Sequence, residues 1–135
     1  MFRSISKNLL PIFQFGFVGA IGFLVDTGCL YLLKSALGIY PAKLISFFMA
    51  ALTTWILNRK ITFRENIPKG NLAIEASKYL IAMLGGGIIN YSIFYVTTKS
   101  FDLFFNHPFI AVAAGSISGM AFNFIASKKV IYKAA

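Results

Sequence analysis

The sequence contains little charge and very few acidic residues. Only 13% of its 135 residues are charged, and Asp and Glu together number four. A soluble domain of this length needs much more polar and charged surface, because its exterior must interact with water. The shortage of charge therefore excludes an ordinary water-soluble domain.

Cysteine and histidine are equally scarce. The single cysteine, Cys29, cannot form an internal disulfide, and we interpret it as a small packed side chain. The single histidine, His107, has no neighbouring metal ligands in the sequence. The chain also lacks a glycine-rich nucleotide loop and a Ser or Cys with an obvious base. We therefore expect a protein that is not an enzyme and uses no metal or cofactor.

Long apolar runs are what the sequence has in abundance. Hydrophobic residues make up 58% of the chain, and its mean hydropathy is +0.74. Four runs cover about residues 12–33, 42–57, 79–98 and 109–126, each near the roughly 20 residues that cross a hydrocarbon core. Helices suit these runs because lipid cannot satisfy exposed backbone groups. The sequence predicts an all-α membrane protein with four transmembrane helices in one domain, residues 1–135.

The connections between the runs contain residues typical of helix ends. Gly38 and Pro41 mark a short turn, and Lys43 lies so near the start of the second run that we expect it to snorkel. The longest polar segment is Asn58–Lys78, and within it Asn71 is a plausible N-cap for a helix that leads into the third run. The first run continues without a small-residue cleavage site, so we expect it to be retained rather than removed as a signal peptide.

Basic residues gather at the ends of the apolar runs. Thirteen Lys and Arg give a net charge of +9, which membrane topology and lipid phosphates explain better than nucleic acid does. Ten of the thirteen fall on the side of both termini and Asn58–Lys78, whereas Lys34, Lys43 and Lys99 fall on the other. The excess of positive charge predicts that both termini are cytoplasmic.

The two halves of the chain resemble each other. The segment 58–63 aligns with 127–132, and the same offset aligns three positions of the second run with three of the fourth: Ser46, Ala50 and Thr54 with Gly115, Gly119 and Asn123. A slightly different offset aligns Asp26 with Asn90 and Gly22 with Gly86. The sequence therefore predicts two pseudo-repeated helical hairpins of the same orientation, related by an axis along the membrane normal.

Asp26 is the most unusual residue, because it is the only acid inside a predicted span. A carboxylate in the middle of a span costs several kcal/mol unless it faces the bundle interior, is paired or is protonated. We interpret Asp26 as functional. The alternative is a structural hydrogen bond between helices, for example to Asn90, which is itself either a functional residue or interhelical glue.

Small residues and aromatic residues form two further patterns. Gly19 and Gly22 lie on or near the face of Asp26, Gly86 follows in the third run, and Gly115 and Gly119 form a small-xxx-small motif that favours helix packing over a ligand groove. Aromatic residues near the ends of the runs are typical of an interfacial belt. They are Phe13, Phe15, Trp55, Phe63, Tyr79 and Tyr132.

A basic pair follows the second helix of each hairpin: Arg59–Lys60 in the first and Lys128–Lys129 in the second. One interpretation is topology together with attraction to anionic headgroups. The other is capture of a phosphate, to which Arg presents a planar fork and Lys a point charge. Position alone favours neither interpretation.

Three stretches together resemble a known family. They are Phe15-Gly16-Phe17-Val18-Gly19 with Asp26, the run from Thr54 to Phe63, and its echo from Asn123 to Tyr132. Over about residues 13–132 the chain is similar to the GtrA-like family of four-span bacterial membrane proteins. The family pattern often has Asn-Phe before the basic segment; Asn123-Phe124 keeps this pattern, and Thr54-Trp55 departs from it.

The resemblance implies a function in the bacterial cytoplasmic (inner) membrane. It implies flipping of a polyprenyl-phosphate-linked sugar, or of a carrier such as undecaprenyl phosphate, for the synthesis or modification of cell-surface polysaccharide and cell wall. The alternative is a non-catalytic anchor or partner subunit of a polyprenyl-phosphate glycosyltransferase. The implied partners are the lipid, the membrane and a second copy of the chain or a glycosyltransferase, with no nucleic acid. A third possibility is a small proton-coupled exporter that uses Asp26 as its proton carrier.

The resemblance also implies roles for particular residues. The cytoplasmic residues Arg59, Lys60, Lys128 and Lys129 would hold the phosphate. The polar side chains inside the spans would give hydrogen bonds to sugar hydroxyls that bare lipid cannot supply. These side chains are Asp26, Asn58, Asn90 and Asn123.

The predicted orientation can be tested by labelling. In a variant with Cys29 replaced and one cysteine introduced at Lys69, a membrane-impermeant thiol reagent should react only after the cytoplasmic membrane is permeabilised. The reason is that the excess of basic residues holds Asn58–Lys78 inside. Labelling of intact cells at this position would contradict the orientation.

Overall fold

The computed structural model describes residues 2–133 and consists of helices. The long ones are α1 (Phe2–Leu37), α2 (Ile39–Lys60), α3 (Leu72–Ser100) and α5 (Pro108–Ala126). Shorter elements are the 3₁₀ turn η1 (Arg64–Asn66), α4 (Asp102–Asn106) and the π-helical turn η2 (Ser127–Ile131). Residues 2–133 contain no strand, and four helices are long and apolar enough to cross a membrane. The predicted all-α, four-span architecture is confirmed.

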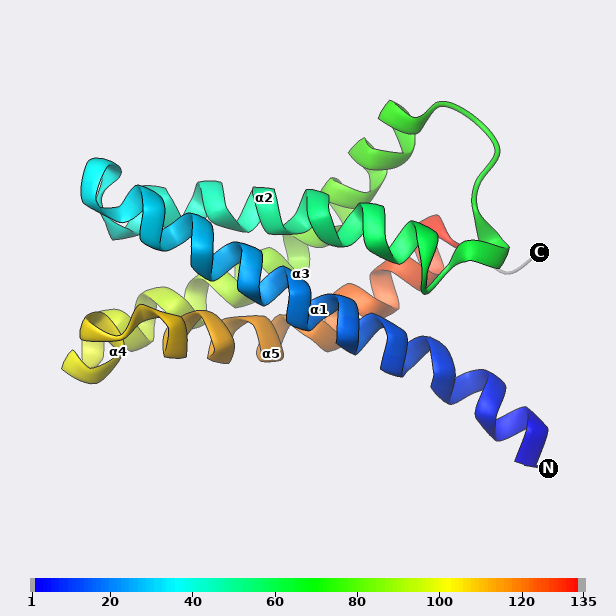
Figure 1. The fold of residues 1–135 in the computed structure, drawn as a ribbon, viewed down its shortest axis with the longest axis horizontal. Helices are drawn as coiled ribbons and strands as arrows, with labels where there is room; N and C mark the ends of the chain where they lie inside the picture. The colour runs from blue at the N-terminus through cyan, green and yellow to red at the C-terminus, as the bar shows by residue number, and fades with distance from the viewer. Residues whose placement is uncertain (1, 134–135) are drawn as a thin grey trace.

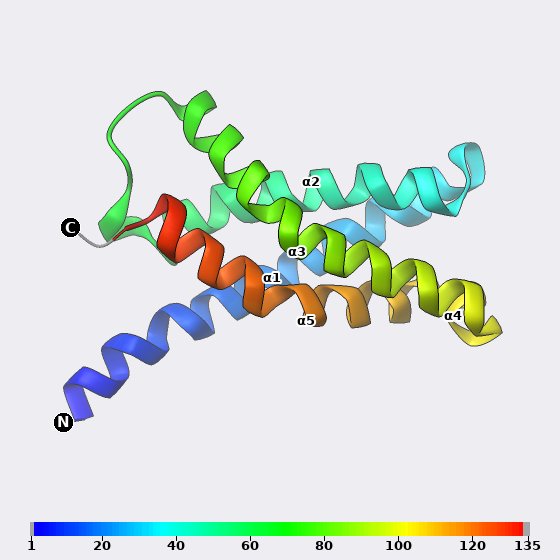
Figure 2. The ribbon, with the colours of Figure 1, turned by 180° about the vertical axis from the view of Figure 1, so that it is seen from behind.

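The helices form two hairpins packed side by side (Figures 1 and 2). α1 packs mainly against α2, and α3 packs mainly against α5; smaller contacts of α1 with α5 and of α2 with α3 complete the ring. Both termini and the 61–71 connection lie at one end of the bundle, here called the basic end. The α1–α2 turn and α4 lie at the other end, here called the far end. The side chain of Arg3, which entered the charge count, lies outside the described part.

The connections follow from local backbone chemistry. Gly38 alone separates α1 from α2, and its φ of 82° is a conformation that favours glycine. The side-chain oxygen of Asn71 accepts a hydrogen bond from the backbone N–H of Ala73 at 2.7 Å, so this residue is the predicted N-cap of α3. Helix occupies both ends of the polar segment Asn58–Lys78, which leaves a connection of residues 61–71.

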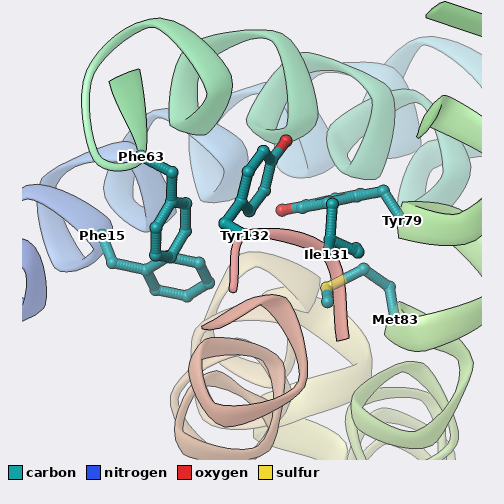
Figure 3. Close-up of a cluster of buried hydrophobic side chains, with 6 residues drawn as sticks. All are labelled: Phe15, Phe63, Tyr79, Met83, Ile131 and Tyr132. Atoms are coloured by element: carbon teal, nitrogen blue, oxygen red, sulfur yellow. The ribbon is translucent and has the colours of Figure 1, made fainter. Parts of the chain in front are cut away.

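The two halves end in the same backbone turn. The N–H of Phe63 donates to the carbonyl of Asn58 at 2.9 Å, and the N–H of Tyr132 donates to the carbonyl of Ser127 at 3.0 Å. Each bond spans five residues, as in a π-turn. The aligned rings of Phe63 and Tyr132 then stack on each other, with centroids 4.5 Å apart and planes 7° apart (Figure 3). The repeat seen in the sequence is therefore a three-dimensional one.

Two hydrophobic clusters occupy the interior, one near each end of the bundle. The basic-end cluster contains Phe15, Phe63, Tyr79, Met83, Ile131 and Tyr132 (Figure 3). The far-end cluster contains Leu30, Ala42, Phe94, Ala111 and Val112. The prediction of an interfacial belt is therefore wrong for Phe15, Phe63, Tyr79 and Tyr132, which are buried because they face the neighbouring helices rather than lipid. Phe13, at 72% exposure, remains on the outside.

Glycines allow α3 and α5 to approach closely. A Cβ added at Gly119 would lie 2.7 Å from the carbonyl oxygen of Gly86, and one added at Gly115 would lie 2.5 Å from that of Asn90. The first hairpin repeats this arrangement, since a Cβ at Gly22 would lie 2.5 Å from Cγ2 of Thr54. The small-residue motif of α5 therefore contacts a helix of the same chain.

Replacing Gly119 with Ala should destabilise the protein by about 1–3 kcal/mol, because the backbone of α3 cannot move away from the new methyl group without breaking its own packing. The matched control is Gly28→Ala in α1, where an added Cβ meets nothing within 4 Å. Thermal unfolding in detergent should show a lower midpoint for Gly119→Ala and an unchanged or higher one for Gly28→Ala. Equal midpoints would contradict the close approach of α3 and α5.

Candidate functional site

A cavity of about 360 Å³ lies between the four long helices. Apolar and small residues make up most of its wall, including Gly16, Gly19, Phe47 and Met83. Polar side chains from every long helix interrupt this wall: Asp26, Thr54, Asn58, Asn90, Ser116 and Asn123. A polar-lined cavity inside membrane-spanning helices is a feature of ligand sites, since polar groups are otherwise avoided there.

Asp26 forms a buried ion pair across the first hairpin. Its Oδ2 lies 2.5 Å from the Nζ of Lys43, and its Oδ1 accepts a hydrogen bond from Ser46 at 2.6 Å. Asp26 is 2% exposed and Lys43 is 0% exposed. The prediction that Lys43 snorkels is wrong, because its ammonium group bonds Asp26 instead of reaching water. The suggested bond between Asp26 and Asn90 is also wrong, since both carboxylate oxygens bond to α2.

Two asparagines that line the cavity have side-chain oxygens without hydrogen-bond partners. The Nδ2 of Asn90 donates to Ser116 Oγ at 3.3 Å, but the Oδ1 atoms of Asn90 and Asn123 have no hydrogen-bond partner within residues 2–133. A buried acceptor left unpaired costs about 1–3 kcal/mol. Both oxygens lie against glycines of the neighbouring helix, Asn90 Oδ1 at Gly115 and Asn123 Oδ1 at Gly86, so a ligand with hydroxyl or N–H donors reaches them when these side chains turn toward the cavity.

Asn58 also lines the cavity, but its amide is already bonded on both sides. Its Oδ1 accepts from Thr62 at 2.8 Å, and its Nδ2 donates to the Tyr79 hydroxyl at 3.2 Å. The same hydroxyl donates to Thr54 at 3.3 Å. These bonds connect α2 to α3 at the basic end of the cavity. Asn58 therefore holds the two hairpins together rather than offering a free group.

A second buried carboxylate, Glu75, lies at the basic end. Arg59 Nε lies 3.0 and 3.1 Å from its two oxygens, and Oε1 also accepts from Trp55 Nε1 at 3.2 Å and from the Tyr132 hydroxyl at 3.0 Å. Glu75 is 6% exposed. It lies in the first turn of α3, ahead of the predicted third span at residues 79–98, in a helix that as a whole is long and apolar enough to cross a membrane.

The Tyr132 hydroxyl remains a neutral donor to Glu75. Burial raises the pKa of Tyr132, and the neighbouring negative charge of Glu75 raises this pKa further. A tyrosine whose pKa is raised keeps its proton throughout the physiological range. The hydrogen bond to Glu75 is therefore a constant feature of this cluster.

The repeat is broken at Glu75. As a result, the predicted phosphate-binding residues of the two hairpins differ in their partners. The alignment that pairs Asp26 with Asn90 also pairs Glu75 with Pro11, so the first hairpin has no acid where the second has Glu75. Arg59 is thus bonded to Glu75, whereas its counterpart Lys128 has no ion pair within residues 2–133.

Exposed lysines at the basic end include two at the end of α5. Lys128 and Lys129 are exposed and line a second depression with Phe124, Ile125 and Lys133. The Nζ of Lys128 lies 6.0 Å from the centre of the Phe124 ring. Lys60 is also exposed, after Arg59 at the end of α2. An anion that approaches the basic end therefore meets free lysines beside α5.

Sequence reasoning missed Lys43 and Glu75 as site residues. For Lys43, the available signal was a lysine and an aspartate in successive spans, since charges inside a membrane normally pair. For Glu75, the signal was the N-cap at Asn71, which places Glu75, Tyr79 and Met83 on one face of α3 at four-residue spacing. The same face in α1 contains Pro11, Phe15 and Gly19.

Comparison with protein families gives a match over most of the chain. The family model described as "GtrA/DPMS, transmembrane domain" matches residues 14–132, which include the whole cavity and the basic-end cluster. None of the curated proteins matches the chain.

Removing one partner of the Asp26–Lys43 ion pair should lower the free energy of unfolding. Lys43→Met should reduce stability by about 3–5 kcal/mol, because it leaves the carboxylate of Asp26 charged and buried without its cation. The double variant Lys43→Met with Asp26→Leu should recover most of this loss. Unfolding of the purified protein in detergent measures both effects. Lys69→Met, in the exposed 61–71 connection, is the control and should change stability by less than about 0.5 kcal/mol. A Lys43→Met variant as stable as this control would contradict the role of the pair.

Proposed function

The chain belongs to the GtrA/DPMS transmembrane-domain family, and on this basis we propose that it moves a polyprenyl-phosphate-linked sugar, or its lipid carrier, across the bacterial cytoplasmic membrane. It is a multi-pass membrane protein of a family related to the handling of polyprenyl-phosphate sugars. Translocation is the specific activity that we infer for this chain, with both termini in the cytoplasm.

The polar-lined cavity carries this proposal. A sugar that crosses bare hydrocarbon loses the hydrogen bonds that its hydroxyls make with water, at several kcal/mol for each group. The side chains of Asn90 and Asn123 line the cavity, and their unpaired amide oxygens would replace part of that hydration once they turn toward the sugar. Asp26 adds a polar group without adding net charge, because Lys43 neutralises it. This neutral, acceptor-rich lining suits an uncharged sugar.

The phosphate would bind at the basic end. Lys128 and Lys129 are exposed directly after α5, and each lysine near an anionic group contributes about 1 kcal/mol. Lys60 offers a further exposed cation on α2. Arg59 contributes to this phosphate site mainly through Glu75, because their ion pair joins α2 to α3 at the basic end. The phosphate can then remain at headgroup depth while the sugar occupies the cavity.

A partner subunit for a polyprenyl-phosphate glycosyltransferase is the competing function. An anchor of this kind needs an apolar exterior and a docking surface, and it needs no polar side chains in its interior. The unpaired asparagine oxygens of the cavity therefore favour translocation. The bundle has only four long helices, so we expect a second copy or a glycosyltransferase beside it in the membrane.

Reconstitution distinguishes the two functions. Proteoliposomes should accelerate the movement of a fluorescent polyprenyl-phosphate-sugar between leaflets, and Lys128→Gln with Lys129→Gln should weaken capture of the lipid by about fivefold for each lysine. The matched control is Lys69→Gln, an exposed lysine of the 61–71 connection at the same end. Movement no faster than in empty liposomes, together with stimulation of an added glycosyltransferase, would overturn translocation and support the partner function.

A further inference from the structure

The cavity is closed at both ends of the bundle. Toward the basic end it is bounded by Phe15, Tyr79 and Met83, which belong to the basic-end cluster. Toward the far end, the ion pair of Asp26 and Lys43 is followed by the far-end cluster, in which Leu30 and Phe94 are completely buried. A ligand cannot reach the cavity along the bundle axis without displacing one of these clusters.

The side of the cavity between α2 and α3 is also closed. Its lining residues there, such as Phe47, Ala51 and Met83, are all buried or half-buried. Phe47 packs tightly on Gly87, since a Cβ at Gly87 would lie 2.6 Å from the tip of the Phe47 ring. This tight packing leaves no opening to lipid on the α2–α3 side.

The opposite side, between α1 and α5, is different. Ala20 of α1 and Ile117 and Met120 of α5 line the cavity and are exposed, Ile117 at 69%. At Gly16 an added Cβ would meet nothing within 4 Å. The repeat pairs Gly19 of α1 with Met83 of α3. A Cβ at Gly19 would lie 3.6 Å from the Sδ of Met120, so a flexible, exposed side chain borders this side where the buried Met83 fills the α2–α3 side. Within residues 2–133, the cavity therefore opens to the bilayer between α1 and α5.

We propose that this gap between α1 and α5 is the binding site for the isoprenoid chain of the phosphorylated lipid, an inference that rests on the proposed function. A cavity of about 360 Å³ is near the small end of ligand sites, which run from about 300 to 1,000 Å³, so it holds a headgroup and not a long hydrocarbon chain. A lipid whose headgroup lies in the cavity must pass its chain out through an open side. The α1–α5 gap provides that side.

Two further observations support a ligand at this gap. Asn90 lines the cavity behind the gap and is 6% exposed, and its Oδ1, which lies against Gly115, has no hydrogen-bond partner within residues 2–133. Lys128 follows α5, one of the two helices that border the gap, and its cation is free of ion pairs within the described chain. Lys128 follows Asn123 by five residues, about 7–8 Å along the helix, so a single lipid can place its phosphate near Lys128, its sugar in the cavity near Asn123 and its chain between α1 and α5.

Photo-crosslinking tests the site without requiring transport. A polyprenyl phosphate with a diazirine on its isoprenoid chain, added to the protein in liposomes, should label residues 16–20 and 113–120. A phospholipid with a diazirine on its acyl chain, at the same concentration, should label the exposed surface of all four helices. Labelling of the outer surfaces of α2 and α3 by the isoprenoid probe, or identical patterns for the two probes, would overturn the proposal.

A pair of glycine variants supplies the matched test. Gly16→Leu places a side chain in the gap, and Gly28→Leu places the same side chain on the exposed surface of α1 outside the cavity; neither added Cβ meets a neighbour within 4 Å. Gly16→Leu should reduce crosslinking by the isoprenoid probe at least tenfold, and Gly28→Leu should leave it unchanged, with equal unfolding midpoints for both. Full crosslinking in the Gly16→Leu protein would overturn the site.

The outcomes separate this site from translocation itself. Crosslinking at the α1–α5 gap in a protein that does not accelerate lipid movement would retain the binding site and reject translocation. Accelerated movement that Gly16→Leu does not slow would retain translocation and reject the site.

Discussion

The ion pair between Asp26 and Lys43 is the interaction on which the interior of this bundle depends. Two opposite charges are stable inside a hydrocarbon layer only while they neutralise each other and their remaining lone pairs are hydrogen-bonded. Here Ser46 donates to the second carboxylate oxygen of Asp26. The pair joins α1 to α2 and ends the cavity toward the far-end cluster. It also gives the far-end part of the cavity a polar lining without net charge. Such a lining suits an uncharged, hydroxyl-rich group in the membrane.

The second organising feature is an incomplete symmetry. The two hairpins repeat their backbone so closely that Phe63 and Tyr132 stack at the point where they meet. The side chains differ where the proposed function needs a difference. Glu75 has no acidic counterpart in α1, so Arg59 is ion-paired and Lys128 has no ion pair within residues 2–133. Gly19 stands in α1 where α3 has Met83, and within residues 2–133 the cavity is open between α1 and α5 and closed between α2 and α3. A fully symmetric bundle would have two equivalent sides and no preferred path for a lipid.

Much of the fold follows from the sequence, because the bilayer imposes strong local rules. The apolar runs, the N-cap at Asn71 and the alignment of the halves predict four helices in two hairpins. The candidate site was only partly predictable. Asp26, Asn90 and Asn123 are recognisable as costly polar residues in apolar runs, but which of them are already bonded depends on helix rotation and register. Asn58 is also a polar residue at the end of an apolar run, but its side-chain amide is already hydrogen-bonded to Thr62 and Tyr79.

The sequence by itself determined that this chain lies in a membrane, how many times it crosses, and which end carries the positive charge. Each of these follows from the local composition of single segments. Tertiary structure alone decided that Lys43 is buried on Asp26, that Glu75 bonds Arg59 and that the cavity opens between α1 and α5. These are contacts between helices, and the same apolar face can satisfy lipid or another helix equally well. Only the packing of all four helices determines which of the two it contacts.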